Sequence, residues 1–216
     1  MNERRIHRIF ETLKERYKVR PKKYDPFRVL MHVMLASRTT DLVSWPAADR
    51  LILRGKTPAI ISRMNVREIE KIILPSNYYK TKARHIKLTC KMLVEKFRGK
   101  VPKTREELME LPGVGPKSAD IVLSFSYGKP VIAVDAHVKW VSHVLKISGE
   151  KNPEKIRERL HEIFPEGERL VINDLLVQFG KEICNTGRPK CWMCPVVRMC
   201  PYEKKRLRRP GAKRIA

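Results

Sequence analysis

Apolar side chains recur at helical spacing along most of the chain. Between residues 3 and 17 they fall at i, i+3, i+4 and i+7, which predicts an amphipathic helix with one apolar face formed by Ile6, Ile9, Phe10, Leu13 and Tyr17. Residues 27–36 are apolar on nearly every side, which predicts a central helix that is buried all round. A third apolar stripe, within residues 81–97, consists of Ile86, Cys90, Leu93, Val94 and Phe97. Cys90 is therefore expected to be a small side chain of the core.

Helix start signals divide this pattern into separate elements. An N-cap residue followed by proline at the first helical position occurs three times, at Asp25-Pro26, Thr57-Pro58 and Asn152-Pro153. Two further pairs have the spacing of a capping box, Asn65 with Glu68 and Thr104 with Glu107. The one extended-looking segment covers residues 130–134. The predicted fold class is all-α, with about ten helices.

The net charge of the chain indicates which kind of partner it binds. The 216 residues include 47 Lys and Arg but only 23 Asp and Glu, so the net charge is +24, which favours a polyanionic ligand such as nucleic acid. No apolar run approaches the roughly 18–20 residues that span a bilayer. The first residues, MNERRIHRIFETL, contain no apolar core of a secretory signal. We therefore expect an intracellular protein of the cytoplasm or nucleoid, without a membrane partner. We also expect it to act as a monomer.

The segment LPGVGPKSA, residues 111–119, predicts two helices joined by a tight turn. Pro112 ends one helix, Pro116 opens the next, and Gly113 and Gly115 permit positive φ and a close backbone approach. Free N–H groups at the start of the second helix form an anion site. An ordinary helical hairpin is the alternative interpretation, but the charge of +24 favours a DNA phosphate as the ligand.

Lys117 stands in the first turn of that second helix. A solvated lysine is the default, but a helix N-terminus disfavours extra positive charge and so favours a nucleophilic amine. Residues 117–127 advance about 16 Å as a helix, and the extended return to Asp135 covers about the same length. Asp135 can therefore come back beside Lys117, although its position before a further apolar stripe also fits a simple N-cap.

Four of the five cysteines crowd into 17 residues, with the spacing Cys184-x6-Cys191-x2-Cys194-x5-Cys200. A tight cluster without a secretory signal indicates a metal site rather than a disulfide framework. Structural zinc usually shows two short Cys pairs, and only one is present here. Prolines follow Cys194 and Cys200, as in some iron–sulfur motifs. On spacing alone, zinc and an iron–sulfur cluster both stay open.

LPGVGPKSAD followed by PVIAVDAHV resembles the endonuclease III family of helix–hairpin–helix DNA glycosylases. The resemblance implies that Lys117 is a catalytic lysine, that Asp135 is a catalytic aspartate and that His137 lies at the DNA. The x6, x2, x5 cysteine spacing is similar to the cluster motif of that family, which implies a [4Fe–4S] cluster on Cys184, Cys191, Cys194 and Cys200. Arg188 and Lys190 would then lie in a basic loop that faces a DNA phosphate.

The same resemblance implies a two-lobed architecture. One lobe is a six-helix barrel, residues 20–129, that carries the hairpin. The other joins residues 1–19 to residues 130–216, holds the cluster and ends in a basic tail from about residue 203. Duplex DNA with a damaged or mismatched base would bind through Gly113, Val114 and Gly115 of the hairpin.

Two departures from the family pattern concern the residues that fill the gap left by a flipped-out nucleotide. Arg38 occupies a position where many members have glutamine, and Tyr78 replaces a smaller residue. Asn77 stands where glycine is usual and is expected to adopt the left-handed conformation.

The predicted function is a base excision repair glycosylase with β-elimination lyase activity on oxidised pyrimidines. A thymine/uracil–guanine mismatch glycosylase on the same scaffold is the alternative, and a non-catalytic DNA-binding module is a more distant one.

Overall fold

The computed structural model describes residues 2–208, and within that range it is built from helices without a strand. This confirms the all-α prediction for the described part of the chain. The chain divides into two compact units, one formed by Lys22–Lys129 and the other by Met1–Pro21 together with Pro130–Ala216. The predicted basic tail extends past residue 208, and that portion lies outside the described residues. No helix in the described range has the length and apolar character needed to cross a membrane.

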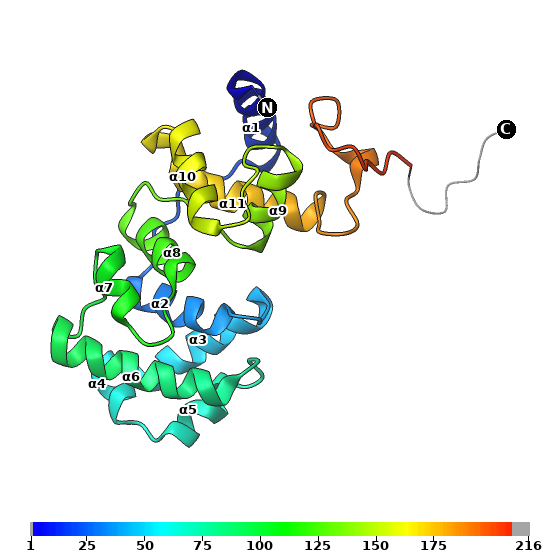
Figure 1. Cartoon of the computed structure of the whole chain (residues 1–216). Helices are drawn as coiled ribbons and strands as arrows, with labels where there is room; N and C mark the ends of the chain where they lie inside the picture. The colour runs from blue at the N-terminus through cyan, green and yellow to red at the C-terminus, as the bar shows by residue number, and fades with distance from the viewer. Residues whose placement is uncertain (1, 209–216) are drawn as a thin grey trace. The chain divides into compact units, whose positions relative to one another are not determined.

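The Lys22–Lys129 unit is organised around one buried helix. Its elements are α2 (Pro26–Ala36), α3 (Asp41–Gly55), α4 (Pro58–Arg63), α5 (Val66–Ile73), α6 (Tyr79–Phe97), α7 (Arg105–Glu110) and α8 (Pro116–Tyr127). Every residue of α2 from Val29 to Leu35 is buried, and the helix packs against α3, α6 and α8 (Figure 1). A helix that is apolar all round requires partners on several sides, which the three neighbours supply.

The predicted helix starts of this unit are confirmed. Asp25 Oδ1 accepts the N–H of Arg28 at 2.8 Å at the start of α2, and Thr57 and Asn65 cap α4 and α5 in the same way. The apolar stripe of α6 is confirmed at Cys90, which is fully buried. It is wrong at Val94, which is 39% exposed.

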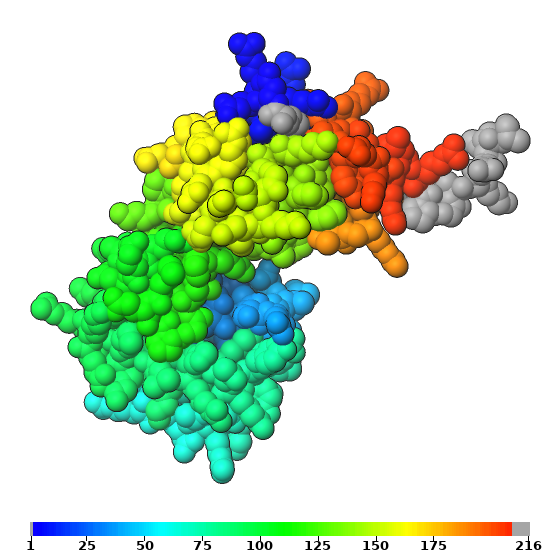
Figure 2. All heavy atoms as spheres, viewed as in Figure 1, coloured from blue at the N-terminus to red at the C-terminus, as the bar shows by residue number. Residues whose placement is uncertain are grey.

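The second unit joins the first helix of the chain to its last third. Its elements are α1 (Glu3–Tyr17), α9 (Ala136–Val144), α10 (Pro153–Ile163), α11 (Glu166–Glu182) and the short 3-10 turn Cys191–Met193. The apolar face of α1 is buried as predicted, and the Phe10 ring lies 4.4 Å from that of Phe164, centroid to centroid. Figure 2 shows α1, in blue, beside the orange and red cysteine-containing segment, where Arg5 Nε donates to the Met199 carbonyl at 2.7 Å.

The extended segment 130–134 enters this unit without forming a strand. Asn173 on α11 donates from Nδ2 to the Ala133 carbonyl at 2.7 Å, and His161 Nε2 accepts the N–H of Ile132 at 3.0 Å. Ile132 and Ala133 are buried, so these two side chains satisfy backbone groups that water cannot reach. The segment therefore delivers Asp135 to the start of α9 in a defined conformation.

Candidate functional site

The hairpin turn lies between α7 and α8. Gly113 has φ +84°, and a Cβ placed on it would lie 2.8 Å from Nδ1 of His85, so glycine is required for both conformation and space. Gly115 is different: its φ is −101°, and an added Cβ would meet nothing within 4 Å. The turn that the two glycines permit thus uses positive φ at Gly113 alone, and Gly115 is the extended N-cap residue that leads the chain into α8. Its openness leaves room for a ligand to approach the backbone.

Hydrogen bonds that the sequence did not predict hold the hairpin in place. Asp120 on α8 is 1% exposed, and its Oδ1 accepts a 2.9 Å hydrogen bond from Nε of Arg105 on α7. Thr89 on α6 donates from its hydroxyl to the Pro112 carbonyl at 2.9 Å. These contacts connect residues 15 and 23 positions apart, too far for a helical or capping rule to detect.

Lys117 is exposed in the first turn of α8. Gly115 caps this helix without a side-chain hydrogen bond, so the first N–H groups of α8 have no side-chain acceptor from the cap. Val114, by contrast, is only 6% exposed, and its N–H donates to the Leu111 carbonyl at 3.0 Å, so the expectation that Val114 contacts DNA has no free donor behind it. The turn therefore combines a primary amine with the positive end of a helix dipole, an arrangement suited to an anion.

A buried histidine lies in the same unit as Lys117. His32 on α2 has Nε2 3.4 Å from the Ser44 hydroxyl and 3.6 Å from Oδ1 of Asp41. Burial lowers the pKa of His32 to about 4, Asp41 opposes this shift, and the positive charge of Lys117 adds to it. His32 is therefore a neutral imidazole at physiological pH, and sequence reasoning had assigned it no role.

Arg38 and Tyr78 form a pair on the surface of this unit. Both are left-handed, with φ +51° and +58°, and the Arg38 guanidinium donates to the Tyr78 hydroxyl at 2.8 Å. Tyr78 is 60% exposed, so an aromatic ring and a cation project together into solvent. The expectation for Asn77 is wrong: Tyr78 takes the left-handed conformation, while the Asn77 amide is used to bond the Arg38 carbonyl.

Asp135 is the N-cap of α9, in the other unit. Its Oδ1 accepts the N–H of Val138 at 2.8 Å, which confirms the capping interpretation. His137, two residues later, packs against α11: a Cβ added to Gly180 would lie 3.1 Å from Cβ and Nδ1 of His137. The absence of a side chain at Gly180 thus makes room for His137.

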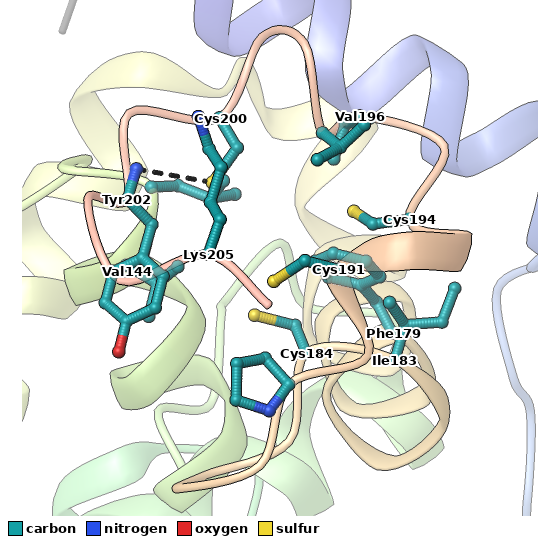
Figure 3. A pocket seen from close by; sticks show the side chains of 13 residues that line it. Val144, Phe179, Ile183, Cys184, Cys191, Cys194, Val196, Cys200, Tyr202 and Lys205 are labelled. Carbon is teal, nitrogen blue, oxygen red and sulfur yellow. Dashed lines mark hydrogen bonds between the residues drawn. The ribbon is translucent and has the colours of Figure 1, made fainter. Parts of the chain in front are cut away.

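The four clustered cysteines line a single pocket within the second unit (Figure 3). Its wall is otherwise mostly apolar, with Val144, Phe179, Ile183 and Val196 among the lining side chains. The N–H of Tyr202 donates to Sγ of Cys200 at 3.5 Å. The loop between the first two cysteines contains exposed Arg188, and it is closed by a 2.8 Å hydrogen bond from the Lys190 N–H to the Ile183 carbonyl.

The chemistry of this donor set fits a metal group. Burial raises the pKa of Cys184 to about 12 and that of Cys194 to about 11, so their thiolates require a cationic partner. The fit concerns the chemistry of the thiols and not their present positions, because between residues 2 and 208 no three His, Cys, Asp or Glu side chains are arranged to hold a metal ion. Cys90, buried in the other unit, takes no part in the pocket.

The family model described as "HhH-GPD superfamily base excision DNA repair protein" matches residues 31–166. Endonuclease III of Thermotoga maritima is 35% identical over 93% of this chain and 94% of its own length. Endonuclease III of Escherichia coli K12 is 33% identical over 83% and 85%. A trapped endonuclease III–DNA covalent intermediate, in an estranged-adenine complex, superimposes with a TM-score of 0.89 at 32% identity, covering 96% of this chain and 100% of that one.

The helical fold and the hairpin are thus those of a base excision DNA repair protein. Within that class, the chain belongs to the endonuclease III family. The family predicted from the hairpin and VDAHV motifs is therefore confirmed. A thermostable thymine-DNA glycosylase superimposes with a TM-score of 0.82 at 24% identity, a likeness that concerns the fold alone.

Proposed function

We propose that this protein removes oxidised pyrimidines from duplex DNA and then cuts the strand at the resulting abasic site. The glycosylase and lyase class of the activity is that of the endonuclease III family, to which the chain belongs. The mismatch alternative is not favoured, because the relatives with 33–35% identity are endonuclease III proteins. The observation that carries the proposal is an exposed Lys117 at the open N-terminus of α8.

Lys117 is proposed to be the nucleophile. Its neutral amine forms a bond to C1′ of the damaged nucleotide as the bond from C1′ to the base breaks, and the base leaves with the electron pair and gains a proton. Opening of the sugar ring gives a Schiff base. Loss of a C2′ proton then expels the 3′ phosphate, and water hydrolyses the Schiff base to release the amine.

Asp135 is proposed to act beside Lys117. A carboxylate stabilises the positive charge that develops on the sugar as the base departs, and it can transfer protons in the later steps. Because its Oδ1 already accepts the Val138 N–H, the carboxylate is fixed in orientation before the substrate arrives. That Asp135 lies beside Lys117 stays a prediction, made from the length of the segment between them and from the family resemblance.

DNA is proposed to bind through the hairpin and through basic residues around it. Gly113 and Gly115 offer backbone N–H groups to a phosphate, while Arg188, Lys190 and His137 supply further contacts. Arg38 and Tyr78 are proposed to fill the space left when the damaged nucleotide is extruded, since the base cannot be reached inside a duplex. A DNA substrate is compatible with the predicted location at the nucleoid.

Cys184, Cys191, Cys194 and Cys200 are proposed to hold a [4Fe–4S] cluster. Four thiols, one buried and three half-buried, line one mostly apolar pocket and match the ligand number of such a cluster, whose iron would supply the positive charge that the thiolates need. The four side chains would bind the iron and would thereby tie the 184–200 segment, with Arg188 and Lys190, to α11.

Borohydride trapping on two duplexes tests the proposal. With a thymine glycol duplex and an abasic-site duplex, borohydride is expected to fix the protein covalently to both DNAs. A panel that adds dihydrouracil, T:G and U:G duplexes then reports the base preference. Efficient release of thymine from T:G without release of thymine glycol would replace the oxidised-pyrimidine substrate with a mismatch.

A further inference from the structure

Lys82 is a buried lysine that the proposed mechanism does not use. It lies on α6 and is 7% exposed, although lysine is rarely buried without a partner. Its Nζ lies 2.6 Å from the Leu35 carbonyl oxygen, 2.8 Å from the Ser37 carbonyl oxygen and 2.9 Å from the Thr39 hydroxyl. The three donors of an ammonium group are thus matched by three acceptors, one in the last turn of α2 and two in the segment that follows it.

The ammonium group caps the C-terminal end of α2. The last carbonyls of a helix lack partners within the helix and carry its negative dipole end, so a cation placed there is stabilised. Burial lowers the pKa of Lys82 to about 8, while the three oxygen acceptors favour the charged form. Lys82 therefore remains largely an ammonium at neutral pH.

The segment that Lys82 holds is also tied to the turn before α6. The Thr39 hydroxyl accepts the Asn77 N–H at 3.2 Å, and the Asn77 side chain bonds the carbonyl of Arg38. Arg38 and Tyr78 belong to the two segments that these hydrogen bonds join. Both have a left-handed backbone conformation, which costs energy for a non-glycine residue. Two strained turns are thus fastened to each other and to one ammonium group.

We propose that Lys82 is the positioning residue that presets the Arg38–Tyr78 pair for entry into DNA. By fixing residues 37–39 against the 77–78 turn, it holds both side chains in one orientation before the duplex binds. Preorganisation of this kind lowers the entropy cost of inserting them as the damaged nucleotide leaves the stack. This proposal rests on the proposed function of Arg38 and Tyr78.

Lys82→Met tests the proposal, with Lys87→Met as the matched control. Lys87 lies on the same helix, and its Nζ also donates to a backbone carbonyl, that of Met64 at 2.7 Å, but away from the Arg38 segment. Relative to the control, Lys82→Met is expected to slow thymine glycol removal from duplex DNA by about 10- to 100-fold, the effect of misplacing a positioned group. Cleavage of a preformed abasic site should change by less than about threefold, since Lys117 is untouched.

Hydrogen exchange gives a second readout that does not depend on activity. Amides of residues 37–40 and 77–78 are expected to exchange faster in Lys82→Met than in Lys87→Met, with the rest of the unit unchanged. Lys82→Arg, which keeps donors and charge, should recover part of the lost rate. If Lys82→Met does not fold, Thr39→Val replaces it in the test, because this variant removes one acceptor of the Lys82 ammonium group and keeps the buried cation.

The outcomes separate this inference from the proposed function. Equal loss of activity on both substrates, or equal exchange in the two methionine variants, would overturn the positioning role. If the wild-type protein releases no thymine glycol at all, the substrate proposal fails, while the exchange comparison still decides whether Lys82 orders the two turns.

Discussion

The imidazole of His32 stacks on the indole of Trp45, with ring centroids 3.6 Å apart and planes inclined by 14°. His32 reaches this position because α2 and α3 pack closely, and the same packing removes it from water. Burial therefore favours the neutral imidazole over the charged imidazolium. The stack therefore makes the stability of the Lys22–Lys129 unit depend on pH.

We expect stability to fall as the pH is lowered from about 6.5 to about 4. The pKa of His32 is about 4 in the folded protein and near its ordinary 6.5 when unfolded, so the unfolded chain binds the extra proton throughout this window. This difference of about 2.5 pKa units corresponds to roughly 3 kcal/mol of unfolding free energy. That contribution is fully lost only below pH 4. His32→Phe keeps the stack but cannot titrate, so denaturant unfolding of this variant should show a flatter pH dependence. Parallel curves for the two proteins would contradict this account.

The two hairpin glycines are expected to respond differently to alanine. Gly113→Ala forces a positive φ on a side chain and a clash with His85, and should cost about 1–3 kcal/mol of stability. Gly115→Ala meets no neighbour, so its thermal midpoint should stay near that of the wild type. The added methyl group would instead obstruct a phosphate at the start of α8. Gly115→Ala should therefore weaken binding to undamaged duplex, measured by fluorescence anisotropy, and wild-type affinity would argue against this anion site.

Substitutions of Lys117 and Asp135 are expected to impair catalysis while DNA binding is kept. Lys117→Gln removes the amine but keeps length and polarity, so it should bind DNA and form no borohydride-trapped adduct. Asp135→Asn can still cap α9, so it should fold and bind, with base release slower by a factor of ~10²–10³. Single-turnover rates and trapping measure both effects. Persistent trapping by Lys117→Gln would mean that another amine is the nucleophile.

The cysteine pocket is expected to contain iron. Purified protein should be brown, absorb broadly near ~400 nm and contain about four iron atoms per chain. Cys194→Ser should lose this absorbance and loosen the 184–200 segment, whereas Cys90→Ser, in the other unit, should keep it. Metal analysis that finds one zinc and no iron would replace the cluster with a zinc site.

The Arg105–Asp120 pair is expected to be essential for the hairpin fold. The Asp120 side chain is 2% exposed and that of Arg105 is 21% exposed, so Asp120→Asn weakens a charge-assisted hydrogen bond at a buried carboxylate and should cost about 1.5–3 kcal/mol. Thermal unfolding measures this loss. A surface pair offers the control: half-buried Arg159 and exposed Glu162 pair on α10, and Glu162→Gln should change stability by less than about 1 kcal/mol.

Much of the fold was predictable because its signals are local. Asp25, Asn65 and Asp135 cap the helices that follow them, and a capping hydrogen bond spans only two or three residues. The buried character of α2 was likewise visible in its composition. Local reasoning was wrong at Val94, which is 39% exposed, and at Asn77, whose amide bonds the carbonyl of Arg38, 39 positions away.

The sequence by itself determined the helical class, the caps, the hairpin motif and the residues that can carry the chemistry. These follow from apolar periodicity and motif spacing, which are properties of neighbouring residues. Only the tertiary structure decided that Lys82 would hold the Arg38 segment, that His32 would be buried on Trp45, and that Asn173 would fasten the approach to Asp135. Each of these contacts joins separate elements, and its cost or benefit exists only once packing has excluded water from both partners.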